Sequence, residues 1–372
     1  MAKYNWNIDT LINRMKLIER LIERETDEEK LFLLQTDYSN LQNHIDDYFD
    51  NTPEDMFKLL EGLQYLKDEL TPMKFLWPDF QEFADITSKF IKVPALKRCN
   101  LSKDDLLSIT HDFYKQLNPF FFGNFMKNFY RRNDHIVFRS HNEDSLYVGE
   151  TITLPSLKES FIEILREYTI DDALTTIHEY SHATSVSINP LHLSSSKTLY
   201  TEIDTIFMEL IASDYLDTIM KSSNAPIIKA DKINEFSGNA DTLCAQIDLI
   251  EEESKTKNGF RNNKELKKVA LEKCDLHPEE VEDLLNYPGI HSSIYLTSFM
   301  FALELYKMYK KDKEKALYYL KRIIMLANLS EEQYYSSIKR FGIIPNQSAN
   351  EFYKECKSDV LRLTRKKSKS RK

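Results

Sequence analysis

Residues 169–188 read TIDDALTTIHEYSHATSVSI and carry the pattern HEYSH at 178–182. Apolar side chains recur every three or four positions along this stretch, which predicts an α-helix. Residues four apart lie one helical turn from each other, so the imidazoles of His178 and His182 project from the same face. Two neutral imidazoles at that spacing suit Zn²⁺, and Glu179 on the adjoining side can accept a proton from a metal-activated water. We therefore predict one zinc ion (Zn2+) per chain, with Glu179 as the base.

The alternative for this pattern is an amphipathic helix with two solvated histidines, and a third ligand would argue against it. Residues 200–211 supply two candidates, Glu202 and Glu209, which are seven apart and share one face of a helix. Two acids on one face are also common on solvated helices. Here large apolar residues flank them, which predicts burial, and a buried acid needs a partner such as a metal. One acid can ligate zinc while the other accepts the ring N–H of a ligating histidine.

A third segment, residues 286–302, places His291 and Tyr295 four apart on one predicted helical face. Either side chain could donate a hydrogen bond to the oxyanion of a tetrahedral intermediate. The alternative, which the residues alone favour, is that Tyr295 is an ordinary ring of the core.

The composition favours a helical protein whose partner is neither nucleic acid nor membrane. Among 372 residues there are only 7 glycines and 11 prolines, too few for a loop-rich all-β protein. The net charge is −9 even though six of the eight residues in 365–372 are basic. The rest of the chain is therefore more acidic still, and it should repel the phosphate backbones of nucleic acids. No run of about 18 apolar residues is present that could span a bilayer.

The cysteines and the first nine residues indicate in which cellular compartment the protein is expected. Residues 1–9 lack the basic and apolar segments of a signal peptide. The four cysteines form no CxxC pair and are predicted to be reduced thiols; they are Cys99, Cys244, Cys274 and Cys356. These features predict a cytoplasmic protein. Nothing in the sequence indicates the oligomeric state.

Secondary-structure signals change partway along the chain. Helix-start signals, such as Ser102 before a run of acids, recur through the first part of the sequence. Two segments rich in β-branched and aromatic residues, 135–138 and 147–154, then predict a small β-hairpin. Ser156 and Glu159 have the form of a capping box, which predicts that helices resume there.

These motifs resemble those of the thimet oligopeptidase and oligoendopeptidase F family of zinc metallopeptidases. That family has an HExGH helix followed by a helix reading E-x-x-[S/T]-x-x-x-E, which here become HEYSH at 178–182 and EIDTIFME at 202–209. The family's tyrosine-rich segment ends in a phrase like Y-A-T-G-x-x-x-A, which is similar to YLTSFMFA at 295–302. The resemblance covers roughly residues 145–360.

The resemblance implies the roles of the site residues. Zinc would be ligated by His178, His182 and Glu202, with Glu179 as general base. Glu209 would contact a ligating histidine.

The chain departs from the family pattern in three ways. Ser181 replaces the glycine of HExGH, a change that a helix tolerates. The tyrosine segment is depleted, so only Tyr295 matches a transition-state tyrosine, and His291 is its neighbour. The chain is also shorter than full-length members, mainly at the N-terminal side, so the channel that restricts them to short peptides is expected to be shallower here.

The expected fold is mainly α, with a small β-hairpin or sheet beside the active site. In chain order we expect an N-terminal helical region (1–140), a catalytic zinc-peptidase region (141–364) and a basic disordered tail (365–372). The expected function is a zinc metalloendopeptidase that hydrolyses short unstructured peptides. The alternative is a zinc- and peptide-binding protein with little or no turnover, and the retention of Glu179 argues against it.

Overall fold

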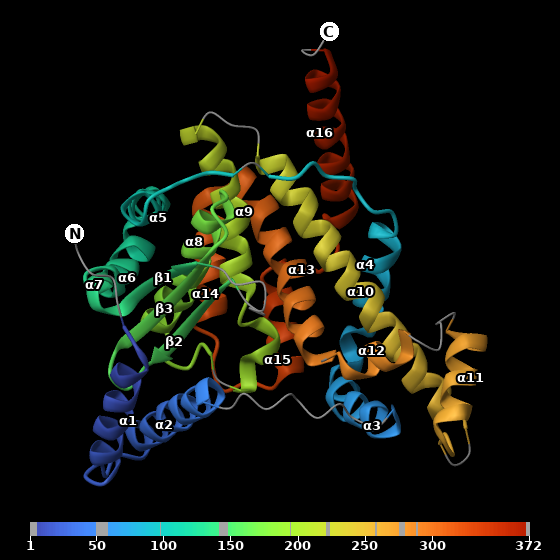
Figure 1. Cartoon of the computed structure of the whole chain (residues 1–372), viewed down its shortest axis with the longest axis horizontal. Coiled ribbons are helices and arrows are strands. Elements are labelled where there is room, and N and C mark those ends of the chain that lie inside the picture. Colours follow the sequence, from blue (N-terminus) through green and yellow to red (C-terminus); the bar gives the residue numbers. More distant parts are fainter. Residues whose placement is uncertain are drawn as a thin grey trace. The chain divides into compact units, whose positions relative to one another are not determined.

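The computed structural model of the chain (Figure 1) describes residues 6–49, 59–96, 98–140, 148–193, 195–220, 224–256, 259–274, 280–287 and 289–369. The chain divides into two compact units. The first, which we call the sheet unit, comprises Met1–Pro53, Ala95–Ser194 and Ile211–Leu216. The second, the helical unit, comprises Glu54–Pro94, Ser195–Leu210 and Asp217–Lys372.

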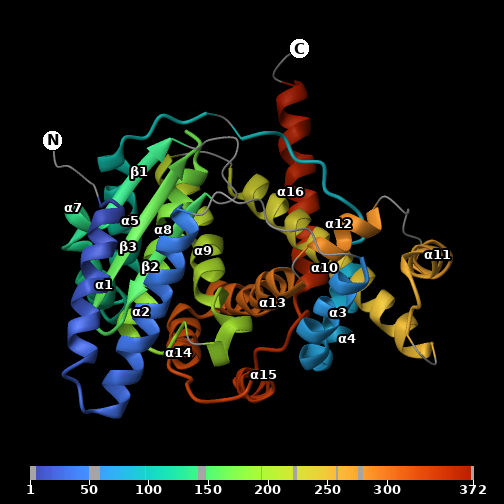
Figure 2. The same cartoon turned by 60° about the horizontal axis from the view of Figure 1, so that its bottom comes forward.

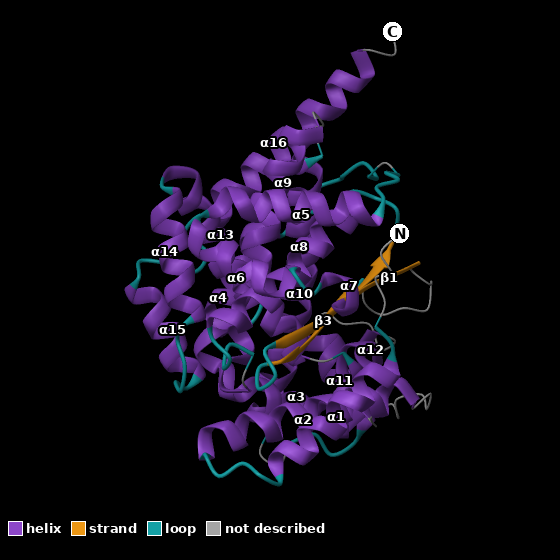
Figure 3. Cartoon of the chain, turned by 90° about the vertical axis from the view of Figure 1, so that its left-hand side faces the viewer, coloured by secondary structure: helices purple, strands orange, loops and turns teal. Residues whose placement is uncertain are grey.

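The sheet unit contains three strands and several helices in its described part. In chain order these are α1 (Ile8–Ile22), α2 (Glu28–Phe49), α5 (Lys103–Leu117), α6 (Pro119–Phe129), α7 (Arg132–His135), β1 (Ile136–Ser140), β2 (Gly149–Leu154), β3 (Glu159–Arg166) and α8 (Asp171–Ile188). Figure 3 shows strands in orange and helices, which make up most of the chain, in purple. The expected fold class, mainly α with a small sheet, is confirmed.

Among its described residues, the helical unit contains helices and no strand. They are α3 (Leu59–Leu70), η1 (Thr71–Leu76), α4 (Trp77–Thr87), η2 (Ser195–Tyr200), α10 (Ala225–Lys255), α11 (Asn263–Lys273), α12 (Glu280–Asn286), α13 (Gly289–Lys311), α14 (Lys313–Ile324), α15 (Glu331–Arg340) and α16 (Ala349–Lys369). One further helix, α9 (Ile203–Met220), contributes residues to both units.

The sheet has the strand order β1-β3-β2, with β1 parallel and β2 antiparallel to β3. The predicted hairpin between 135–138 and 147–154 is therefore wrong in its pairing, because β3 lies between the two predicted strands. The prediction that helices resume at Ser156 is also wrong, since β3 begins at Glu159. Here the capping-box pattern belongs to a tight turn, in which Lys158 adopts a left-handed φ of 55°.

Helices pack on both faces of this sheet. Apolar residues of α1 and α2 form a core with alternate residues of β2, among them Ile152 and Leu154. Figure 2 shows α1 and α2 side by side next to the sheet. α8 packs against β2 and β3. Every residue of β3 after Glu159 is buried, as expected for a central strand covered on two sides.

The units do not follow the chain order that the sequence predicts, because each is assembled from separate segments. The basic end, expected to be disordered from residue 365, is helical as far as Lys369 as part of α16. Apolar residues of α16, including Phe352 and Val360, are buried and anchor its earlier turns. The helix then continues beyond the buried part.

Two further findings concern the chain as a whole. Among the described helices, none combines the length and the apolar character needed to cross a bilayer. The four cysteines are free thiols.

Candidate metal centre

The HEYSH pattern lies in the middle of α8, whose start is fixed by a buried ion pair. Asp172, in the first turn, accepts hydrogen bonds from Nε of Arg166 at 3.0 Å and from the backbone N–H of Glu167 at 2.8 Å. Arg166 ends β3, so the pair ties the strand to the helix that follows it. An acid in the first turn is also favoured by the helix dipole.

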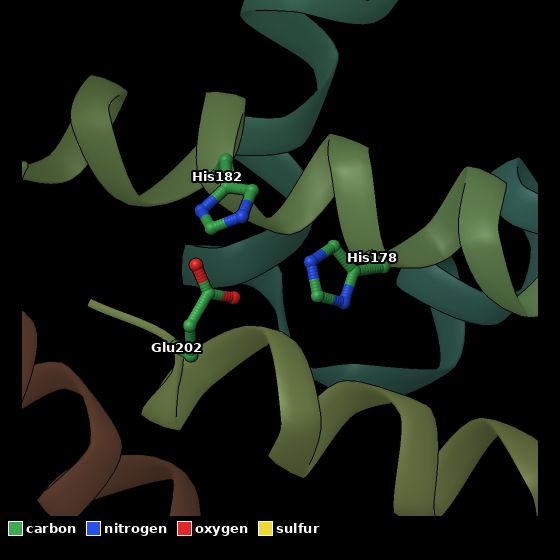
Figure 4. Close-up of side chains that lie close together, drawn as sticks. All are labelled: His178, His182 and Glu202. Atoms are coloured by element: carbon green, nitrogen blue, oxygen red, sulfur yellow. The ribbon is translucent and has the colours of Figure 1, made fainter. Parts of the chain in front are cut away.

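Three of the predicted side chains lie close together. His178 and His182 project from one side of α8 toward Glu202, which directly precedes α9 (Figure 4). Each residue offers one donor atom, and these atoms lie within 4.8 Å of one another. Glu202 is 8% exposed, so its carboxylate is largely removed from water.

The donor set of His178, His182 and Glu202 fits a zinc ion. Two imidazoles and one carboxylate form a common three-ligand set of catalytic zinc sites, which leave a fourth position open. Donors around one tetrahedral zinc, at about 2.0–2.1 Å from it, are about 3.3–3.5 Å apart. The three donor atoms here lie within 4.8 Å of one another, so small side-chain movements would bring them to ligating separations.

Glu202 is positioned by hydrogen bonds at the start of α9. The Thr205 hydroxyl lies 2.8 Å from Oε2 of Glu202 and can donate to it. The preceding helix η2 is fixed at both of its last residues. The Ser298 hydroxyl donates to the carbonyl of Leu199 at 3.1 Å, and the Tyr200 hydroxyl donates to the carbonyl of Glu331 at 2.8 Å.

Glu179 contacts β2 and is almost fully buried, at 5% exposure. The Thr151 hydroxyl lies 2.7 Å from Oε2 of Glu179 and 3.0 Å from its backbone carbonyl. Gly149 lies against the other carboxylate oxygen, because a Cβ added at this glycine would be 2.7 Å from Oε1. The proposed base is thus held between its own helix and the strand.

Ser181, which stands where the resembling family has glycine, is accommodated by α5. Its hydroxyl lies 2.7 Å from the hydroxyl of Tyr114 and donates to the carbonyl of Ile177 at 2.9 Å. Both side chains are buried. The serine hydroxyl therefore has hydrogen-bond partners on the side of α8 that packs on α5.

Glu209 lies two turns after Glu202 on α9 and is also buried. Its Oε2 is 2.7 Å from Nζ of Lys232 on α10, an ion pair that supplies the partner a buried acid requires. The sequence did not indicate this lysine. That Glu209 contacts a ligating histidine remains a prediction.

His291 and Tyr295 lie one turn apart on α13, as expected. Their ring centroids are 4.7 Å apart, with His291 exposed and Tyr295 half-buried. Half-burial is compatible with a hydroxyl that reaches a substrate and with a ring that packs at the edge of a core. The role of each residue remains a prediction.

Thr151 and Gly149 are site residues that sequence reasoning missed. Their spacing of two was a usable signal, because it places both on one face of a strand. Which helix this face packs on depends on the fold and cannot be read from the strand alone.

Solved structures share the fold, while no protein-family model and no curated protein matches the sequence. A "putative peptidase" from Chlamydophila abortus matches with a TM-score of 0.52 and 10% identity, over 87% of this chain and 60% of its own. A "putative oligoendopeptidase F" matches with a TM-score of 0.51 and 12% identity, over 93% of this chain and 66% of its own. This chain thus spans less than two thirds of either structure. The fold expected from the resemblance is confirmed.

Proposed function

Starting from the fold shared with these structures, we propose that the chain is a zinc-dependent metalloendopeptidase that hydrolyses short unstructured peptides. The observation that carries the proposal is that His178, His182 and Glu202 lie close together. A buried glutamate, Glu179, is next to His178 on α8. A structural zinc site has no need of such a glutamate, whereas hydrolysis needs a base.

His178, His182 and Glu202 would hold the ion. Zinc, when bound, supplies a Lewis acid that acidifies a water and polarises the substrate carbonyl. The three side chains come from α8 and from the start of α9, and both segments are fixed by the hydrogen bonds described above.

Glu179 would act as general base and then as general acid. It takes a proton from the attacking water and later delivers that proton to the leaving amine. The Thr151 hydroxyl lies 2.7 Å from its Oε2 and would orient the carboxylate. Tyr295 would donate a hydrogen bond to the oxygen of the scissile carbonyl as negative charge develops there.

The substrate would bind in extended form along β2. Within the described sheet this strand pairs only with β3, so its other edge can accept backbone hydrogen bonds from a peptide. Such pairing gives affinity without strict sequence preference. We expect cleavage of unstructured peptides of roughly 5–20 residues and no cleavage of compact folded proteins.

A mixed peptide library, incubated with zinc-loaded protein and analysed by mass spectrometry, tests the proposal. The wild-type chain should cut internal bonds, and Glu179→Gln should lower the rate at least about 100-fold at unchanged zinc content, because an amide cannot accept the proton. Glu167→Gln, at an exposed glutamate of the same unit, is the matched control and should keep full activity.

Two results would contradict this proposal at different points. Undiminished cleavage by Glu179→Gln would reject Glu179 as the base. A wild-type chain that binds zinc and peptides and cuts none of them would reject the peptidase activity and favour a binding protein without turnover.

A further inference from the structure

We propose that β2 positions the general base: the Thr151 hydroxyl holds one carboxylate oxygen of Glu179, and the missing side chain of Gly149 leaves room for the other. The inference rests on the proposed function insofar as Glu179 is the base. It assigns to the strand a role beyond binding the substrate backbone.

The register of β2 places both residues on the face toward α8. Ile152 and Leu154 lie in the core formed with α1 and α2. Since side chains alternate along a strand, Gly149 and Thr151 belong to the opposite face. Contacts with α8 on that face agree with this assignment.

The hydrogen bond from Thr151 fixes the rotation of the carboxylate. Its hydroxyl has one proton and lies nearest to Oε2 of Glu179, at 2.7 Å. A hydrogen bond to an ionised group is about twice as strong as a neutral one, and Glu179 is shielded from competing water at 5% exposure. With Oε2 held by this hydrogen bond, the carboxylate is restrained from rotating about its Cγ–Cδ bond.

Position 149 requires a glycine because β2 lies close to the side chains of Glu179 and Thr175 on α8. A Cβ at this position would lie 2.7 Å from Oε1 of Glu179, 2.7 Å from Cγ2 of Thr175 and 3.0 Å from Cγ of Glu179. Any other residue would therefore displace the Glu179 side chain or push β2 away from α8. The glycine keeps the strand close enough for the Thr151 contact.

Thr151 acts through Glu179 and is thus a positioning residue. A mispositioned base slows proton transfer but leaves substrate binding and the metal ligands intact. Removal of the hydroxyl should therefore lower kcat and leave KM and zinc content unchanged.

Three variants test the role of the hydroxyl. Thr151→Val removes the hydroxyl at constant shape and should lower kcat about 10- to 100-fold, with KM and zinc content within about twofold. Thr151→Ser restores the donor and should recover most of kcat. Thr110→Val, which removes a buried hydroxyl from α5 in the same unit, is the matched control and should behave as wild type.

A double-mutant cycle separates positioning from a general effect on the fold. If Thr151 works through Glu179, Thr151→Val should cause little further loss when added to Glu179→Gln. Equal losses in both backgrounds would overturn the proposal, as would a Thr151→Val variant with normal kcat.

Crystal structures test the same inference without activity. In zinc-loaded Thr151→Val the Glu179 carboxylate should rotate away from its wild-type position, and in Gly149→Ala it should be displaced. An unmoved carboxylate in both variants would overturn the inference. If the wild-type chain cut no peptide, the proposed function would fail, and these structures would still decide whether β2 positions Glu179.

Discussion

At the scale of single residues, Tyr295 offers the sharpest choice between two roles. Tyr295→Phe removes only the hydroxyl. If this hydroxyl stabilises the oxyanion, kcat should fall roughly 100-fold with little change in KM or Tm, because the bond forms mainly in the transition state. A ring that serves only packing would give nearly normal kcat and at most a modest loss of stability.

His291 is the natural comparison for Tyr295, since the two rings lie 4.7 Å apart. His291→Ala should lower kcat less than Tyr295→Phe if the histidine only orients substrate. Steady-state kinetics on one peptide measures both variants. A silent Tyr295→Phe together with a nearly inactive His291→Ala would contradict the assignment and give the donor role to the histidine.

The shared face of His178 and His182 could be predicted at this scale because local spacing determines it. A separation of four brings His178 and His182 to one face of a helix, whatever the rest of the chain does. The contacts of Thr151 with Glu179 and of Lys232 with Glu209 could not be predicted. They join residues from different elements, so they depend on strand register and helix packing.

At the scale of elements, β3 shows where pattern reading fails. The strand is buried on both faces, so it lacks the polar alternation that marks a half-exposed strand. The pair Ser156 and Glu159 imitates a helix start but belongs to the turn before β3. Ser102, by contrast, was predicted to begin a helix and does cap α5, where it pairs reciprocally with Asp105.

A buried acid ties α2 to the turn before β3 and makes stability depend on pH. Asp37 is 1% exposed and accepts hydrogen bonds from the backbone N–H and the hydroxyl of Ser156. Burial raises its pKa from 3.8 to about 6, against the opposing effect of these hydrogen bonds. The folded state therefore binds the proton more tightly than the unfolded state, and the contribution of Asp37 to stability falls as pH rises from about 4 to about 6.

Asp37→Asn should remove this pH dependence. Between pH 4 and 6 the free energy of unfolding of the variant should fall less than that of the wild type, by ~2 kcal/mol at most. Urea denaturation at several pH values measures the difference, and Glu28→Gln, at an exposed acid of α2, is the matched control. Parallel curves for the wild type and Asp37→Asn would contradict the assignment.

At the scale of the whole molecule, the resemblance in a few motifs predicted the fold class better than it predicted the organisation of the chain. Scarce glycine and proline already favoured helices, and the fold of the solved peptidase structures confirms the expectation. The two units could not be predicted, because each joins segments that are distant in sequence. Residues of α9 belong to both units, so no single boundary along the chain can separate the two.

We propose above all that the chain holds a catalytic zinc ion through His178, His182 and Glu202. The most direct test is the metal content of the purified protein, measured by inductively coupled plasma mass spectrometry. We expect about one zinc per chain, which should be mostly lost when His178, His182 or Glu202 is changed to alanine and retained in Glu179→Gln. Zinc that survives Glu202→Ala but is lost in Glu209→Ala would contradict the ligand set, and a chain that binds no zinc would contradict the claim itself.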